Sequence, residues 1–490
     1  MWKGNHEVIN FLKLLDSFGK CPFLLKEEVT FSYEELRKAV ENAGIRLKEV
    51  GVLKGQYVPI LIEASSEYLT ALLAIFTLGA CAVPLDIGMT EDEIHDVMIS
   101  LDTHLVVTAP DYSAKAGRVA EVIVELDWRT LLSKVENPLK TKIKSADVIN
   151  PDSKALVLFS SGSNGKPKGV VRSYRAVWNQ MEALSQAFLL KPGDLILCTA
   201  RPQHSYGLEN VLAALYGGAA ICFRDVVEYN MIKESLADSR FTVFAGVPII
   251  YEILAKIRKS SVDNSRLRLA LSAGAPLSEE VNREFEKTYR IPVTQVYGSS
   301  EAPSSTANLE VASNKEYLSV GKPIQGVEIR IMNEAGESLP VDTIGELWVK
   351  SPFASDYYLD QPELTKKHFV GGWFRTGDLG YLSEDGMLFL RGKMKSMINV
   401  AGNKVNPEEI EALLCTYPGV EEVMVSGIPD KVYGEMVRAV IVPEKGRTID
   451  EAELLKFCQG KIADFKIPRI IDYSSSLQRT ATGKLKREKI

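Results

Sequence analysis

A polar stretch at residues 158–170, LFSSGSNGKPKGV, has the residue types of a loop that binds phosphate. Its glycines Gly162, Gly165 and Gly169 allow backbone N–H groups to approach an anion closely. Neutral hydrogen-bond donors come from Ser160, Ser161, Ser163 and Asn164, and positive charge comes from Lys168. A flexible surface turn has a similar composition, so the stretch alone leaves both interpretations open.

The stretch differs from the nucleotide-binding pattern GxxxxGK[ST], in which a hydroxyl residue follows the lysine. Here Lys166 precedes Pro167 and Lys168 precedes Gly169, so neither lysine has that neighbour. The apolar runs on both sides predict a strand, the loop and a second strand. A helix should follow, with Ser173 as its N-cap. Its apolar face would carry Val177, Met181, Leu184 and Phe188.

Length and composition limit the classes of protein to consider. A chain of 490 residues is too long for one core and predicts at least two domains. The net charge is −6 with both signs dispersed, which argues against a basic nucleic-acid-binding surface. Six widely spaced cysteines indicate reduced thiols and a cytoplasmic protein. Five scattered histidines, without an HExxH pattern, argue against a zinc site.

Short apolar runs alternate with helical patterns through the first two thirds of the chain, which predicts an α/β fold with largely parallel sheets. After Gly345 the pattern becomes a meander of strands. A compact unit follows from about Lys395, with helices at 407–417 and 450–464. The apolar run Leu69–Leu85 contains Gly79 and Pro84, so it predicts a buried helix and a strand rather than a membrane span.

The phosphate-loop stretch closely resembles the signature of the adenylate-forming (ANL) superfamily, which includes acyl-CoA synthetases, adenylation domains and firefly luciferase. Other motifs of that family follow in the same order along nearly the whole chain. They are GACAVPLD (79–86), RPQHSYG (201–207), LSAGAPLS (271–278), VYGSSEA (296–302), GEL (345–347), WFRTGDLG (373–380), GKMKSMINVAGNKVNPEEIE (392–411) and LQRTATGKLKR (477–487).

The resemblance implies a large N-terminal domain, residues 1–394, made of α/β layers and a β-barrel-like subdomain. It also implies that residues 395–490 form a small, mobile α+β domain that acts as a lid. Lys395 occupies the position of the family's hinge, where other members carry Asp or Lys. Rotation about it would withdraw Lys484 and bring Gly402 and its neighbours toward a thiol tunnel.

The reaction implied by the resemblance is the joining of a carboxylate to ATP, which gives an acyl-adenylate and pyrophosphate. Since the carboxylate is itself the nucleophile, positioning and charge neutralisation at the α-phosphate are the main demands. Glu301 would hold Mg²⁺, and Ser300 would contact the α-phosphate. Lys484 would bridge the carboxylate and the phosphate, and His204 would lie at the mouth of the acyl pocket.

By the same resemblance, Asp378 would accept hydrogen bonds from the ribose hydroxyls, and Tyr297 would stack on adenine. The remaining nucleotide contacts would come from Gly274, Ala275, Pro276, Gly298 and Ser299. The chain departs from the family pattern at three positions. Asn164 replaces a hydroxyl residue, Lys393 replaces an arginine, and Asn399 stands where many CoA ligases have lysine. Lys393 would therefore offer a single donor to the ribose in place of a fork.

The identity of the acid and of the thiol is less constrained. Amino-acid-activating members carry an aspartate in the fourth motif, whereas this chain reads HSYGLEN, with Glu209 as the acidic residue. We therefore expect a fatty, aryl or related acid, with fatty acid metabolism as one context. The expected acceptor is CoA; the alternative is phosphopantetheine on a separate acyl or peptidyl carrier protein. A luciferase-like oxidation and a non-catalytic binding protein remain as further alternatives, and the oligomeric state is not predicted.

Overall fold

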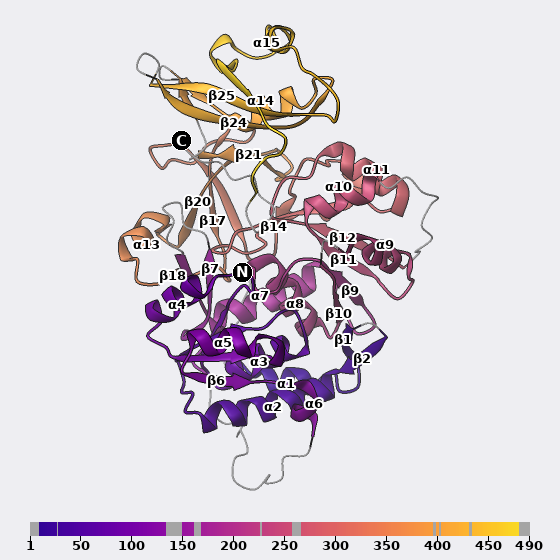
Figure 1. Cartoon of the computed structure of the whole chain (residues 1–490), viewed down its shortest axis with the longest axis vertical. Helices are drawn as coiled ribbons and strands as arrows, with labels where there is room; N and C mark the ends of the chain where they lie inside the picture. The colour runs from indigo at the N-terminus through magenta and orange to yellow at the C-terminus, as the bar shows by residue number, and fades with distance from the viewer. Residues whose placement is uncertain are drawn as a thin grey trace. The chain divides into compact units, whose positions relative to one another are not determined.

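The structure is a computed structural model of the whole chain (Figure 1). It describes residues 9–26, 28–133, 149–160, 168–225, 228–256, 266–394, 398–400, 403–430 and 434–479. The chain divides into two compact units. The first contains Met1–Ile329 and Val349–Phe374, and the second contains Arg330–Trp348 and Arg375–Ile490.

A seven-stranded sheet in the first unit has the order β18-β8-β7-β4-β3-β5-β6. Its strands are β3 Tyr57–Leu61, β4 Cys81–Pro84, β5 Leu105–Thr108, β6 Val122–Glu125, β7 Lys154–Ser160, β8 Lys168–Ser173 and β18 Tyr357–Tyr358. The pairs from β7 through β6 are parallel, whereas β7 with β8 and β8 with β18 are antiparallel. Strands β4 and β5 are buried throughout, which explains their unbroken apolar sequences. The antiparallel β7–β8 pair confirms the two strands that were predicted on either side of the loop.

A nine-stranded sheet of the same unit has the order β15-β14-β13-β12-β11-β9-β10-β1-β2. Its strands are β1 Pro22–Lys26, β2 Val29–Ser32, β9 Leu195–Cys198, β10 Ala220–Phe223, β11 Val243–Gly246, β12 Leu269–Ser272, β13 Val293–Tyr297, β14 Thr306–Ala307 and β15 Lys322–Pro323. The run from β1 through β13 is parallel. Parallel strands end at a common edge, so the loops that follow β9, β11, β12 and β13 open on one side of the sheet.

Helices accompany both sheets of the first unit (Figure 1). They are α1 Phe11–Asp16, α2 Tyr33–Glu49, α3 Ser66–Thr77, α4 Glu91–Ser100, α5 Ser113–Val119, α6 Trp128–Leu132, α7 Tyr174–Ala187, α8 Ser205–Gly217, α9 Tyr229–Ala237, α10 Pro248–Lys256, α11 Glu279–Tyr289, α12 Val311–Asn314 and α13 Pro362–His368. Ser173 caps α7 by accepting a hydrogen bond from the Ala176 N–H, as predicted. The predicted apolar face of α7 is buried.

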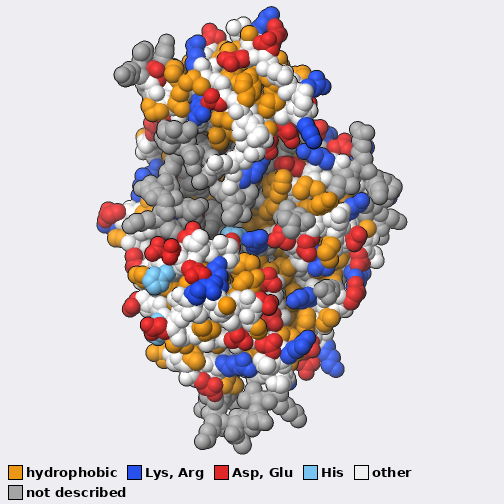
Figure 2. Space-filling model, viewed as in Figure 1, with side chains coloured by type: hydrophobic (Ala, Val, Ile, Leu, Met, Phe, Trp, Pro, Cys, Tyr) orange, Lys and Arg blue, Asp and Glu red, His pale blue; other side chains and the backbone are white. Residues whose placement is uncertain are grey.

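The long apolar run Leu69–Leu85 forms most of α3 and the whole of β4, which confirms the prediction of a helix followed by a strand. Helix α3 is only 12 residues long, and Gly79 turns the chain with φ +70°. Within the described part of the chain, no helix combines the length and the apolar character that a membrane crossing needs. On the face drawn in Figure 2, acidic and basic side chains are interspersed.

The predicted meander after Gly345 is a five-stranded sheet with the order β16-β17-β20-β19, and β21 pairs with β20. Its strands are β16 Glu328–Met332, β17 Gly345–Lys350, β19 Phe369–Val370, β20 Trp373–Leu382 and β21 Leu388–Lys393. Within the second unit, β20 and β21 form an antiparallel hairpin around Gly386, which has φ +76°.

The C-terminal part of the second unit is a five-stranded sheet with two helices. Its order is β23-β22-β25-β24, with β26 beside β25. The elements are β22 Ile398–Val400, β23 Asn403–Val405, α14 Pro407–Leu414, β24 Val420–Asp430, β25 Gly434–Pro443, α15 Glu451–Cys458 and β26 Ile470–Tyr473. Both helices are shorter than predicted. Pro418 disfavours a helical Tyr417, and the chain leaves α15 through an extended Gln459 and a left-handed Gly460.

A polar cluster lies inside the first unit, between β8, α7 and α8. Arg172 donates to the side-chain oxygen of Gln180, and Gln180 donates to Glu209 Oε2 at 3.0 Å. Ser304 donates to the other oxygen, Glu209 Oε1. Arg172 is 1% exposed and Glu209 is 4% exposed. Both ionisable groups are thus removed from water and depend on these contacts.

The burial of Glu209 predicts a dependence of stability on pH. Burial raises the pKa of Glu209 to about 8, although Ser304 and Arg172 oppose the change. The unfolded chain loses this proton near its usual pKa, so the group's contribution to stability is fullest below that value. The contribution is lost as pH rises toward 8.

The substitution Glu209→Gln removes the ionisable group and keeps a side chain of similar shape. We expect the thermal midpoint of the wild type to fall between pH 5 and pH 8.5 by about 2–4 °C more than that of the variant. Differential scanning calorimetry across this range measures the difference. Glu49→Gln, at the exposed end of α2, is the matched control and should follow the wild type. Parallel wild-type and Glu209→Gln profiles would contradict the prediction.

Candidate active site

The hairpin of β7 and β8 holds the two described ends of the predicted phosphate loop. Ser160 is the last residue of β7 and pairs in register with Lys168, the first residue of β8. The loop residues Ser161, Gly162, Ser163, Asn164 and Gly165 lie outside the described residues. Gly169 follows Lys168, and a Cβ there would lie 3.0 Å from Leu359 Cβ. Its missing side chain therefore allows β18 to lie closely against β8.

The segment after β13 turns sharply and carries Glu301. A Cβ at Gly298 would lie 2.3 Å from the Ser304 backbone nitrogen, so only glycine fits where the chain folds back. Ser299 closes the turn, because its N–H donates to the Ala302 carbonyl at 2.9 Å and its hydroxyl accepts from the Ala302 N–H at 3.1 Å. Ser300 and Glu301 are thereby presented at the end of the strand.

Two contacts from residues 355–358 fix Glu301. The Ser355 N–H donates to the Glu301 carbonyl at 2.7 Å, and the Tyr358 hydroxyl donates to Glu301 Oε1 at 2.7 Å. The Ser355 hydroxyl also lies 3.5 Å from the Ser300 carbonyl oxygen. Both the main chain and the carboxylate of Glu301 are therefore oriented by the same short segment.

The predicted adenine-binding residues follow neighbouring parallel strands. Gly274, Ala275 and Pro276 follow β12 and are exposed, and Gly274 has φ +95° with open space beside it. Tyr297 ends β13 and is 8% exposed. Because β12 and β13 pair in register, the two segments leave the same edge of the sheet.

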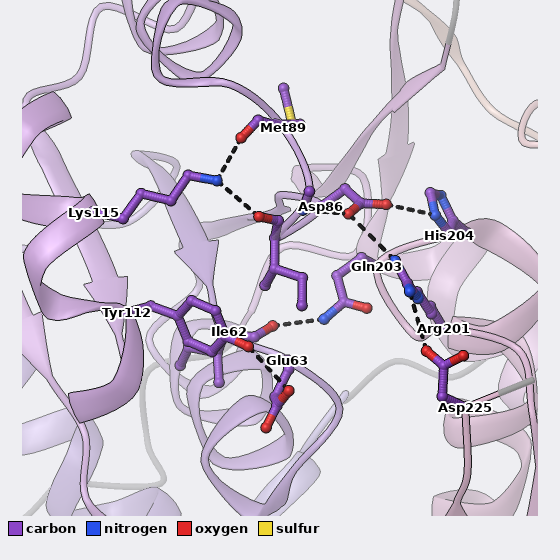
Figure 3. A network of polar contacts seen from close by, with 12 residues as sticks. Ile62, Glu63, Asp86, Met89, Tyr112, Lys115, Arg201, Gln203, His204 and Asp225 are labelled. Carbon is purple, nitrogen blue, oxygen red and sulfur yellow. Dashed lines mark hydrogen bonds and ion pairs between the residues drawn. The ribbon is translucent and has the colours of Figure 1, made fainter. Parts of the chain in front are cut away.

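His204 contacts a carboxylate that follows strand β4 (Figure 3). His204 Nε2 lies 2.9 Å from Asp86 Oδ2. Arg201 connects two carboxylates, with Nη1 3.8 Å from Asp86 Oδ1 and Nη2 3.1 Å from Asp225 Oδ2. Gln203, which lies between Arg201 and His204 in the same loop, donates to the Ile62 carbonyl at 2.6 Å. The loop that carries His204 is thus fastened to both sheets of the first unit.

These contacts change the acidity of Asp86. The hydrogen bond from His204 is the largest cause of a lowered pKa, and the Gly88 N–H and Arg201 act in the same direction. Partial burial opposes them, and the resulting pKa is about 2. Asp86 is therefore an ionised acceptor over the whole physiological range, able to hold the imidazole in one orientation.

In the second unit, Asp378 and Lys393 are opposite one another on β20 and β21. Lys393 Nζ lies 3.3 Å from Asp378 Oδ1. The Asp378 N–H donates to the Thr376 hydroxyl at 2.9 Å, and Gly377 has φ +71°, so the turn before Asp378 is tightly defined. Lys395, Gly402 and Lys484 lie outside the described residues, as does the side chain of Asn399.

Family models match two parts of the chain. Residues 15–359 match the model for the AMP-binding enzyme family, and residues 409–484 match the AMP-binding enzyme C-terminal domain. The chain belongs to the AMP-binding enzyme family. The resemblance to the adenylate-forming superfamily is thereby confirmed.

Relatives of this AMP-binding enzyme are named as CoA ligases. The 2-succinylbenzoate–CoA ligase of Listeria monocytogenes is 31% identical over 95% of this chain and 94% of its own length. The oxalate–CoA ligase of Arabidopsis thaliana is 28% identical, with 93% and 92% covered. The solved structure of ATP-bound MatB from Rhodopseudomonas palustris has a TM-score of 0.88 and 28% identity, with 97% of each chain covered.

These similarities confirm two predictions made from the sequence. The mixed α/β fold, with a large N-terminal and a smaller C-terminal domain, matches solved structures of the superfamily. The prediction of an AMP-forming ligase of the acyl-CoA synthetase type is also confirmed.

Two residues of the AMP-binding enzyme were missed by sequence reasoning. Asp86 follows a buried parallel strand, a position where functional carboxylates are common, so its place in the chain was a usable signal. Tyr358 lies on the two-residue strand β18, which pairs with β8 although β18 begins 184 positions after the end of β8 in the sequence. No local pattern marks Tyr358.

The Asp86–His204 contact predicts a stability effect that depends on pH. Since the folded-state pKa of Asp86 lies below its usual value, its contribution is present at neutral pH and is lost as pH falls toward 2. We expect Asp86→Asn to lower the free energy of unfolding by about 2 kcal/mol at pH 7. The difference from wild type should narrow between pH 4 and pH 3.

Urea unfolding at several pH values measures this effect. Glu63→Gln is the control, because Glu63 accepts a hydrogen bond from Tyr112 at 3.0 Å in the same region but is not paired with His204. That variant should lie within about 0.5 kcal/mol of wild type. A loss in Asp86→Asn that is the same at every pH would contradict the proposed cause.

Proposed function

We propose that this enzyme activates a carboxylic acid without an α-amino group and transfers the acyl group to CoA. The observation that carries the choice of acid is the state of Glu209, the acidic residue of the fourth motif. Both of its carboxyl oxygens accept hydrogen bonds from protein groups, Ser304 and Gln180. To pair with Glu209, a substrate ammonium would have to displace these donors and reach a residue that is only 4% exposed.

The relatives support the same choice. Their names include oxalate, indoleacetate and 2-succinylbenzoate as acids, and none of these carries an α-amine. The acid of this enzyme is thus a fatty, aryl or related carboxylic acid, and dicarboxylic acids belong among the candidates. The proposed acceptor is CoA because the named relatives are CoA ligases. A carrier protein bearing phosphopantetheine is the alternative acceptor.

Mg²⁺ is proposed as a companion of ATP, with Glu301 as its protein ligand. Among the described residues, no group of three or more His, Cys, Asp or Glu side chains could hold a metal ion. A single oriented carboxylate nevertheless fits Mg²⁺, which protein sites commonly bind through one or two carboxylates and the phosphates of the substrate. When bound, the ion would neutralise charge on the phosphates of ATP.

The remaining roles are proposed from the family motifs. Lys168 and the loop that precedes it contact the phosphates, and Ser300 contacts the α-phosphate. Asp378 accepts from the ribose hydroxyls, and Lys393 is beside it as a single donor. The adenine site is formed by Tyr297 with Gly274, Ala275, Pro276, Gly298 and Ser299.

Lys484 brings positive charge to the reacting carboxylate and the α-phosphate during adenylation. The lid of this proposal spans 395–490 and turns about Lys395, so that Gly402 replaces Lys484 near the reacting atoms in the second half-reaction. His204, oriented by Asp86, lies at the mouth of the acyl pocket. All six cysteines are free thiols, which agrees with a proposed cytoplasmic location.

The first test incubates the purified enzyme with ATP, Mg²⁺, CoA and a panel of acids. The panel contains fatty, aryl, dicarboxylic and amino acids, and mass spectrometry detects acyl-AMP and acyl-CoA. We expect acyl-CoA from one class of acid that lacks the α-amine. Acyl-AMP without acyl-CoA would redirect the acceptor to a carrier protein. Efficient use of an amino acid would overturn the argument from Glu209.

The second test separates the two half-reactions with Lys484→Ala. The lysine charge is needed only while ATP reacts, so adenylation should fall at least about 100-fold. Conversion of supplied acyl-AMP and CoA into acyl-CoA should stay within about threefold of wild type. Lys486→Ala, two residues away in the same basic stretch, is the control. Equal loss of both half-reactions in Lys484→Ala would argue against the rotation of the lid.

A further inference from the structure

Tyr358 is a buried residue that contacts the proposed Mg²⁺ ligand directly. Its hydroxyl donates to Glu301 Oε1 at 2.7 Å, and the residue is 2% exposed. The ring packs against Phe369 and His368, with centroid distances of 5.5 Å and 6.0 Å. The phenol therefore has little freedom, and its hydrogen bond to Glu301 is a fixed feature of the fold.

The same ring also contacts the proposed phosphate-binding lysine. Lys168 Nζ lies 5.3 Å from the centroid of the Tyr358 ring, within the range of a cation–π interaction. Tyr358 thus touches both a cation and a carboxylate to which the proposed function gives a role at the phosphates of ATP. The two contacts use different parts of one side chain: the ring face for Lys168 and the hydroxyl for Glu301.

Backbone contacts fix Tyr358 with respect to both groups. In the antiparallel pair of β18 and β8, Tyr358 is opposite Val170, and the Leu359 N–H donates to the Gly169 carbonyl at 2.8 Å. At the other end of the segment, the Ser355 N–H donates to the Glu301 carbonyl at 2.7 Å. The five residues 355–359 therefore connect the strand of Lys168 to the turn of Glu301.

We propose that Tyr358 is a positioning residue that sets the distance and orientation of Glu301 relative to Lys168 for the binding of Mg²⁺ and ATP. The inference rests on the proposed function, in which Glu301 holds Mg²⁺. With one carboxylate oxygen occupied by the phenol, the orientation of the other is fixed, as outer hydrogen bonds commonly fix metal ligands. The ring separately limits where the Lys168 ammonium lies.

The test uses Tyr358→Phe, which removes the hydroxyl and keeps the ring. Isothermal titration calorimetry measures the binding of a non-hydrolysable ATP analogue, first with EDTA and then at rising Mg²⁺ concentrations. Because the ring still faces Lys168, affinity in EDTA should stay within about twofold of wild type. The tightening that Mg²⁺ produces should be reduced about tenfold or more, the usual effect of losing an outer hydrogen bond at a metal ligand.

The control is Tyr357→Phe, the same chemical change at the adjacent, 39% exposed tyrosine of β18. It should match wild type in every titration. In activity assays, Tyr358→Phe should lower acyl-AMP formation about tenfold or more. Its conversion of supplied acyl-AMP into acyl-CoA should stay within about twofold of wild type.

Three outcomes would overturn the proposal. One is a Mg²⁺ dependence in Tyr358→Phe equal to that of wild type. Another is an equal weakening of binding in EDTA and in Mg²⁺, which would indicate general damage to the site. The third is an equal loss of both half-reactions. A wild-type enzyme that forms no acyl-AMP from any acid would instead reject the proposed function, and the binding titrations would still decide the role of Tyr358.

Discussion

The pairing of β8 with strands on both of its sides is the constraint on which the candidate site depends. One side pairs with β7 and defines the two ends of the phosphate loop. The other side pairs with β18, which carries Tyr358 to the carboxylate of Glu301. Gly169 permits this second pairing, since a side chain there would press on Leu359. Backbone hydrogen bonds therefore bring Lys168 and Glu301 to a common side chain, although they are 133 positions apart in the sequence.

Buried charge makes a second demand on the same region. Arg172 of β8 is buried and donates to Gln180 of α7, and Gln180 in turn donates to Glu209 of α8. Ser304, three residues beyond Glu301, completes the cluster. A buried charge without partners would cost several kcal/mol, so the three elements and the turn cannot shift independently. The cluster that withdraws Glu209 from a substrate amine also stabilises the segment that presents Glu301.

The sequence was informative where function depends on contiguous residues. The strands β7 and β8, the Ser173 cap and the apolar runs of β4 and β9 each have a local physical cause, so they could be predicted. The contacts of Asp86 with His204 and of Tyr358 with Glu301 could not. Their partners come from distant strands, and only the order of the sheets brings them together. Helix ends were misjudged for a smaller reason: Pro418 restricts the residue before it, and the chain turns through a left-handed Gly460 soon after α15.

The departure at Lys393 is explained more fully by the structure than by the motif. Lys393 lies 3.3 Å from Asp378 but is 61% exposed, whereas Asp378 is 16% exposed. An ammonium on a flexible, solvated stem makes a weak surface ion pair and can leave it at little cost. A guanidinium bound through two parallel hydrogen bonds would hold the carboxylate more firmly. In the proposed function, lysine at this position can therefore give way when Asp378 accepts from the ribose hydroxyls, at the expense of one donor to the nucleotide.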